Sequence, residues 1–90
     1  MPKCTHELKT WPTPFQAVWD GMKRHEIRRD DRNFQVGDDL ILKEYDPETK
    51  AYSGRSIHAR VTYKSMPGTF GLPADLCVLS FVYYVPKPWG

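Results

Sequence analysis

The segment from Ser56 to Lys64 alternates between apolar and polar side chains, and this alternation restricts the fold more than any other feature of the chain. The apolar set and the polar set have four members each: Ile57, Ala59, Val61 and Tyr63 against His58, Arg60, Thr62 and Lys64. A period of two is typical of a β-strand with one buried face. We therefore expect a strand here, with the apolar set in the core.

Other segments also have the composition of strands. They are His6–Lys9, His25–Arg28, Asp39–Tyr45, a return that begins near Tyr52 with a bulge or bend at Gly54, and Leu76–Tyr84. Short loops between consecutive strands favour antiparallel pairing. The total of about five to six strands predicts a small, partly closed β-barrel, because closure protects the strand edges.

One short helix is expected after the first strand. Thr13 is suited to the N-cap and Pro14 to the first helical position. An apolar face follows at helical spacing, formed by Phe15, Val18, Trp19 and Met22. Gly21 is expected to end the helix. The predicted fold class is therefore mainly β (α+β).

Length and charge limit the classes of function that the chain can have. Ninety residues make a single domain, 1–90, whose core we place at about 5–84 and whose tail at 85–90. The formal net charge is only +2. Binding to nucleic acid would therefore have to rest on a local basic patch rather than on bulk charge.

We expect a cytoplasmic protein that does not contact a membrane. The start of the chain lacks the apolar run of a secretory signal, and no stretch approaches about 18 apolar residues. The two cysteines, Cys4 and Cys77, are expected to be reduced, with Cys77 in the core. The three histidines, His6, His25 and His58, do not have the spacing of metal ligands, so no metal and no cofactor is expected.

Five Lys/Arg side chains, one histidine and three carboxylates gather within the twelve residues from Gly21 to Arg32. If His25–Arg28 is a strand, Glu26 and Arg28 share one face, and Ile27 on the other face belongs in the core. Arg28 is suited to a bidentate contact with a phosphate or a base edge. The alternative is a solvated Glu26–Arg28 pair, worth at most about 1 kcal/mol.

The neighbouring candidates each have two interpretations. Lys23 is either a ligand contact, to phosphate or to a water that it helps to activate, or a cation that stabilises the end of the helix. Trp11, two residues after Lys9 at the end of the first strand, either stacks on a base or has a packing role, in the core or as a staple of the helix. Arg32 is expected to be tied to Asp30 or Asp38, and such a tie would also orient it for a ligand.

Six segments, taken together and in order, resemble a known family. They are His6–Lys9, Gly21–Arg28 with Lys23 and Glu26, Asp31–Asp38 with Phe34 and Gly37, Leu40–Asp46, Tyr52–Arg55, and Val61–Tyr63. This string is similar to a group of small bacterial and phage proteins of unknown function that is assigned to the ASCH superfamily. The resemblance covers roughly residues 6 to 82 and implies a PUA-like β-barrel.

The resemblance also implies two kinds of activity. ASCH and PUA-like domains are mostly associated with RNA binding. One bacterial branch hydrolyses N4-acylated cytidine with a Lys, a Thr and a Glu. Lys23 falls on the Lys position, but Glu26 stands where the Thr would be, and we find no counterpart of the later Glu. The main expectation is therefore binding.

Three hypotheses follow, and whether the protein is an enzyme stays open. The first is an RNA- or nucleotide-binding module with a small basic cleft formed by Lys9, Trp11, Lys23, Glu26, Arg28 and Arg32. The second is an amidohydrolase for an N4-acylated cytidine-type nucleoside, with Lys23 and Glu26 as catalytic residues. The third is a phage-type interaction module that binds a protein partner through the same group of charged residues. A monomer or a weak dimer is expected in each case.

Overall fold

The computed structural model describes residues 3–84, and the tail expected at 85–90 lies outside them. Within the described residues the chain forms five strands and one helix. They are β1 (Thr5–Thr10), α1 (Pro12–Trp19), β2 (His25–Arg29), β3 (Asp39–Asp46), β4 (Ala51–Ser65) and β5 (Leu76–Tyr84). The predicted fold class is confirmed: the protein is mainly β, with one short helix after the first strand.

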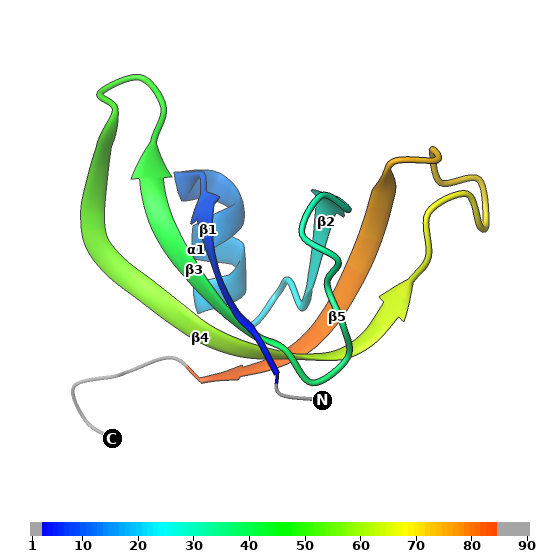
Figure 1. The fold of residues 1–90 in the computed structure, drawn as a ribbon. Coiled ribbons are helices and arrows are strands. Elements are labelled where there is room, and N and C mark those ends of the chain that lie inside the picture. The colour runs from blue at the N-terminus through cyan, green and yellow to red at the C-terminus, as the bar shows by residue number, and fades with distance from the viewer. Residues whose placement is uncertain (1–2, 85–90) are drawn as a thin grey trace.

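The five strands form one sheet in the order β1-β3-β4-β5-β2, and this sheet curls into a half-barrel (Figure 1). The consecutive pairs β3–β4 and β4–β5 are antiparallel, as expected, and the β5–β2 pair is antiparallel as well. The β1–β3 pair is parallel. The parallel pair arises because α1 and β2 lie between β1 and β3 in the chain and return it to the same end of the sheet.

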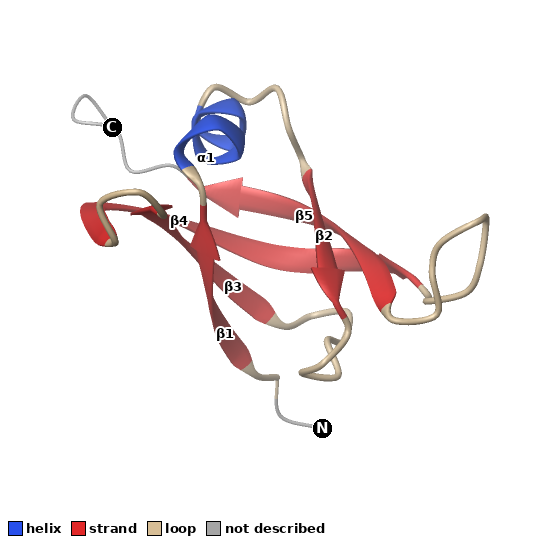
Figure 2. Cartoon of the chain, turned by 90° about the horizontal axis from the view of Figure 1, so that it is seen from above, coloured by secondary structure: helices blue, strands red, loops and turns tan. Residues whose placement is uncertain are grey.

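The barrel is open between β1 and β2, which are the two edges of the sheet among the described residues. We call the space between these two edge strands the seam. Helix α1 connects the strands at one end of the seam, and the loop of residues 30–38 leaves β2 at the other end (Figure 2). The seam therefore has a helix at one end and a loop at the other.

The core fills the concave side of the half-barrel. Its buried side chains are Leu8, Phe15, Val18, Phe34, Leu40, Leu42, Ile57, Ala59, Val61, Cys77, Leu79 and Phe81. Helix α1 contributes Phe15 and Val18, and the loop contributes Phe34. The burial of Cys77 is as predicted, and the loss of water raises the pKa of its thiol.

The helix begins and ends earlier than predicted. Its N-cap residue is Trp11, which makes no side-chain capping bond, and Pro12 is the first helical residue. A proline fits there because the first turn has no acceptor for its missing N–H. Gly21, at φ +82, follows the end of the helix. Met22 therefore lies beyond the helix and is exposed rather than part of its apolar face.

A β-bulge interrupts the alternation that identified β4. The register with β5 shifts between Val61 and Tyr63, so the extra residue reverses the faces of the last part of the strand. Tyr63, expected in the core, is 61% exposed. Lys64, expected in solvent, turns inward to the carboxylate of Asp30. A second shift lies opposite Gly54, where a bulge or bend was predicted.

Candidate functional site

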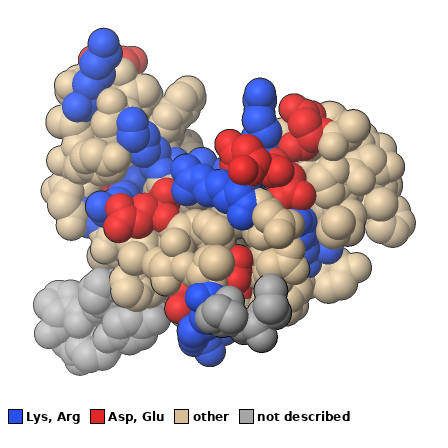
Figure 3. Space-filling view, in the orientation of Figure 1, with Lys and Arg blue, Asp and Glu red and all other residues tan. Residues whose placement is uncertain are grey.

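Most of the predicted site residues meet at one hollow of ≈ 390 Å³ beside the start of α1. We call this cavity the hollow. Its polar and aromatic lining consists of Lys9, Thr10, Trp11, Lys23, Glu26 and Arg28, and Pro14 and Ile27 complete it. Five of the six residues expected to bind a ligand therefore line the same cavity, and Arg32 is the exception. Basic and acidic side chains lie next to each other across the middle of the face in Figure 3.

The carboxylate of Glu26 is buried in the wall of the hollow, and both of its oxygens accept a hydrogen bond. Its residue is only 4% exposed. Oε1 accepts a hydrogen bond of 3.0 Å from Nζ of Lys23, and Oε2 accepts one of 3.0 Å from Nε of Arg28. A buried carboxylate is tolerated where charged donors satisfy both of its oxygens. Glu26 therefore holds the two cations in fixed positions.

The burial of Glu26 reverses the expected orientation of β2. Glu26 and Arg28 do share one face, but that face points inward, and Ile27 is 56% exposed. The prediction that Ile27 lies in the core is wrong. The reason is that β2 is an edge strand whose inner face borders the hollow, so a paired carboxylate fits there as well as an apolar side chain.

Lys23 is bound on two sides. Besides Glu26, its ammonium donates to the carbonyl oxygen of His25. Its backbone N–H donates to the carbonyl oxygen of Ala17 in α1, at 3.1 Å, and this bond fixes where the chain leaves the helix. The ammonium is thus held at the hollow by two residues of β2 rather than left to solvent at the end of the helix.

Arg28 connects the two edge strands. Its Nη2 donates to the carbonyl oxygen of Lys9 on β1 at 2.7 Å, while its Nε donates to Glu26 on β2. A guanidinium group has five donor hydrogens in a rigid plane. The carbonyl is neutral and Glu26 has one negative charge, so Lys23, Glu26 and Arg28 together keep one net positive charge at the hollow.

The two residues from the first strand contribute differently. The ammonium of Lys9 lies 4.4 Å from the ring centroid of Tyr45 on β3, so Lys9 offers the hollow its carbonyl oxygen rather than its charge. The indole of Trp11 lines the hollow and is 60% exposed. Of the two interpretations of Trp11, packing in the core does not apply.

The sequence interpretation missed Thr10. This residue is buried and lines the hollow beside Lys23 and Glu26. Its hydroxyl lies 3.5 Å from the carbonyl oxygen of Leu8, which is a long hydrogen bond. The period of two along β1 was the available signal, because Thr10 shares a face with the buried side chains of Leu8 and His6.

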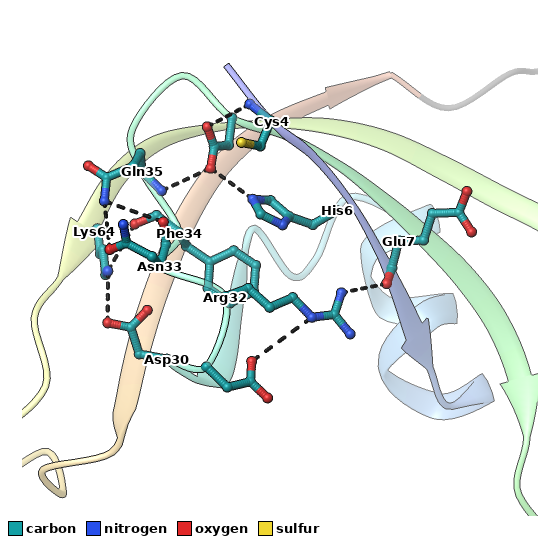
Figure 4. Close-up of polar contacts among 11 residues, drawn as sticks. Cys4, His6, Glu7, Asp30, Arg32, Asn33, Phe34, Gln35 and Lys64 are labelled. Carbon is teal, nitrogen blue, oxygen red and sulfur yellow. Dashed lines mark hydrogen bonds and ion pairs between the residues drawn. The ribbon is translucent and has the colours of Figure 1, made fainter. Parts of the chain in front are cut away.

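Arg32 lies farther along the seam, outside the hollow. Its Nη1 donates to the carbonyl oxygen of Glu7 on β1 at 2.8 Å, and its Nε is 3.9 Å from Oδ1 of Asp31 (Figure 4). The prediction of a tie to Asp30 or Asp38 is wrong. Each of those carboxylates is bound elsewhere, Asp30 by Lys64 and Asp38 by His6.

A second buried carboxylate, that of Asp38, lies at the loop end of the seam, where it binds His6 of β1. Asp38 accepts hydrogen bonds from Nε2 of His6 at 2.8 Å and from the backbone N–H groups of Gln35 at 3.0 Å and Cys4 at 3.1 Å (Figure 4). We call these four residues the Asp38 cluster. Burial by itself would raise the pKa of Asp38, but the bonds from His6, Cys4 and Gln35 outweigh it and lower the pKa.

The loop is anchored next to this cluster as well. Nζ of Lys64 donates to Oδ2 of Asp30 and to the carbonyl oxygen of Phe34, both at 2.9 Å. The ring of Phe34 meets the imidazole of His6 edge to face at 4.7 Å. These contacts fix the loop that carries Arg32, and they explain why the bulge in β4 turns Lys64 inward.

A third charged cluster attaches α1 to the β3–β4 hairpin. Nε and Nη2 of Arg55 each donate to the carboxylate of Glu44 at 3.0 Å, and the guanidinium lies 5.0 Å and 4.8 Å from the ring centroids of Phe15 and Trp19. The hydrogen bonds from Arg55 lower the pKa of Glu44, and the same bonds raise that of Arg55. This arrangement positions the helix.

Residues 3–84 contain no group of three or more His, Cys, Asp or Glu side chains placed to hold a metal ion. In the same residues, no helix has the length and apolar character needed to cross a membrane.

Comparison with known proteins gives a family and a phage relative. The family model described as "Domain of unknown function (DUF3850)" matches residues 5–81. The "Uncharacterized 12.9 kDa protein in GpA 3'region" of Escherichia phage P2 is 42% identical over 57 residues. Those residues are 63% of this chain and 50% of the relative, so the match spans half the length of that protein. Neither description names an activity.

Proposed function

Since this chain belongs to the family described as "Domain of unknown function (DUF3850)", we propose a function for it from the geometry of the hollow. The protein binds RNA or a nucleotide-like ligand, with one base in the hollow and phosphate at its cationic rim. Membership of the ASCH superfamily, with its PUA-like barrel, is part of this proposal, as is a cytoplasmic location of the protein.

The observation that carries the proposal is the buried carboxylate of Glu26 between Lys23 and Arg28, beside the exposed indole of Trp11. Indole faces stack on bases with little sequence preference. Arginine suits phosphate because its planar fork matches two oxygens, and lysine adds a point charge. Glu26 fixes the positions of both cationic side chains before the ligand binds, which reduces the side-chain entropy lost on binding.

The test measures binding of a short fluorescein-labelled RNA by anisotropy at several salt concentrations. We expect affinity to fall with salt, with a log–log slope of about −0.7 per phosphate contacted. The triple variant Lys23→Met, Glu26→Met and Arg28→Met should lose this binding. Replacing all three charges together avoids leaving one buried charge without a partner.

Arg29→Gln is the matched control, because Arg29 is an exposed cation of the same strand outside the hollow. It should bind as the unmodified protein does. If the triple variant is folded, by circular dichroism, and keeps both the affinity and the salt slope, the hollow is not the binding site.

A second function is favoured by one specific observation. Lys23 and Glu26, in contact at 3.0 Å, line the hollow together with Thr10, which carries a hydroxyl group. An ammonium, a carboxylate and a hydroxyl are groups that can move protons around a water molecule. In this second proposal, water adds to the amide carbonyl of an N4-acylated cytidine-type nucleoside. The C–N bond then breaks, releasing a carboxylic acid and the free amine.

Incubation with N4-acetylcytidine tests this second proposal. Release of cytidine, followed by chromatography, should be abolished by Glu26→Gln, which keeps the shape of the side chain. Absence of release from a panel of acylated nucleosides would remove the hydrolase and leave the binding proposal standing.

A further inference from the structure

The arginine contacts along the seam have a regular spacing. Arg28 donates to the carbonyl oxygen of Lys9, and Arg32 donates to that of Glu7, two residues earlier on β1. A strand rises about 3.3 Å per residue, so these two anchor points are about 6.6 Å apart. The two guanidinium groups are thus placed one after the other along the same edge.

The next position in this series is the hollow. Trp11 follows Lys9 by two residues, and its extended backbone (φ −66, ψ 155) continues the course of β1. Along the β1 edge of the seam, the exposed indole of Trp11 is therefore followed by the guanidinium of Arg28 and then by that of Arg32. Successive nucleotides of an extended single strand repeat at a comparable distance.

Both guanidinium groups keep capacity for a ligand. Their partners on β1 are neutral carbonyl oxygens. Arg28 shares the single carboxylate of Glu26 with Lys23, so these three groups keep one net positive charge. Arg32 lies 3.9 Å from the exposed carboxylate of Asp31, a surface ion pair with which a phosphate can compete. Arg32 engages one of its five donor hydrogens in this bond, and its side chain is 47% exposed. Phosphate oxygens can occupy the remaining donors without breaking the contact to β1.

We propose that the seam is a track for single-stranded RNA, with one base in the hollow against Trp11 and two successive phosphates at Arg28 and Arg32. This inference rests on the proposed binding function and adds the length of the bound segment and its course along β1. It also assigns a binding role to Arg32, which lies outside the hollow. A free mononucleotide would fill only the part of the track nearest the hollow.

The first experiment compares uridine oligomers of one to six nucleotides. Affinity should rise from the mononucleotide to the trinucleotide and then stay level, because a third nucleotide brings the second phosphate to Arg32. Arg32→Gln should weaken the trinucleotide about tenfold, the effect of losing a charged hydrogen bond, and leave the mononucleotide unchanged. It should also reduce the magnitude of the salt slope by about 0.7.

Two matched variants separate charge from structure. Arg32→Lys keeps the charge and should keep the salt slope, and Arg29→Gln should change neither quantity. Asp31 lies 3.9 Å from Arg32 and competes with phosphate, so Asp31→Asn should tighten the trinucleotide by about two- to fivefold, the size of a surface ion pair. Thermal unfolding of each variant checks that the loop remains in place.

The outcomes distinguish this inference from the proposed function. If the mononucleotide and the trinucleotide bind equally well and Arg32→Gln changes neither, the track is refuted while the hollow remains a binding site. If neither the mononucleotide nor any oligomer binds, the proposed function fails together with the track.

Discussion

The hollow and the Asp38 cluster lie at opposite ends of β1, and each contains a buried carboxylate. Glu26 is 4% exposed and Asp38 is 3% exposed. Their partners differ. Glu26 is held by two cationic side chains beside an open cavity, whereas Asp38 is held by two backbone N–H groups and an imidazole, next to the packed ring of Phe34.

This difference shows that burial of a charged group does not by itself mark a binding site. Asp38 binds backbone groups from two separate segments, at Cys4 and Gln35, so it fixes the course of the chain. Glu26 binds the side chains of Lys23 and Arg28, and both of these residues line the hollow. We therefore expect changes at Asp38 to affect folding and changes at the hollow to affect ligand binding.

The largest effect is expected for Asp38→Ala. The change leaves His6 and the two backbone N–H groups without an acceptor in a buried place, and we expect a loss of about 3–5 kcal/mol in the free energy of unfolding. Urea unfolding measures it. Asp38→Asn retains one acceptor oxygen and should lose less. A loss below about 1 kcal/mol for Asp38→Ala would show that the cluster does not hold the loop.

The next effect, on binding rather than folding, is expected for Trp11→Ala. Loss of one stacked base should weaken RNA binding by about 1–3 kcal/mol. The free energy of unfolding should change by no more than about 0.5 kcal/mol, because the indole is largely exposed. Anisotropy and urea unfolding measure the two quantities on the same preparation. Equal losses in binding free energy and in the free energy of unfolding would show that Trp11 supports the fold as much as it supports binding.

A smaller effect is expected from pH. Because the pKa of Asp38 is lowered in the folded protein, its ionised form contributes stability that is fully present above the unfolded pKa of about 3.9. This contribution is lost as pH falls through that value toward the lower folded pKa. Unfolding measured between pH 6 and pH 2 should show the advantage over Asp38→Asn shrinking below about pH 4. A constant difference across this range would contradict the assignment.

The smallest effect is expected for Ile27→Thr, which keeps a β-branched side chain on β2. Because Ile27 is exposed, the free energy of unfolding should change by about 0.5 kcal/mol or less. A core position would lose several times more. Urea unfolding therefore tests whether the inner face of β2 carries Glu26, as the structure has it, or Ile27.

The sequence predicted the elements better than their faces. Periodicity located the strands and the short helix, since local spacing of apolar residues reflects secondary structure. It also placed Glu26 and Arg28 on one face of β2. A period of two cannot say which face is inside, so the inward direction of Glu26 was missed. The alternation in β4 likewise could not reveal the bulge that turned Tyr63 outward.

The residues of the hollow could be nominated from their types and from the resemblance, but their contacts could not. The partners of Arg28 and Arg32 on β1 are backbone carbonyls 19 and 25 residues earlier. Every residue has a carbonyl group, so composition gives no hint of such a partner. The same holds for the N–H groups that bind Asp38.

The sequence by itself determined the mainly β class, the order of the elements and the gathering of charge between the helix and the second strand. These properties depend on local spacing, which a linear pattern records. The tertiary structure alone decided that the barrel stays open between its first two strands, and which charged groups face that opening. Those features depend on strand order and on one-residue shifts of register, which arise from packing between segments far apart in the chain.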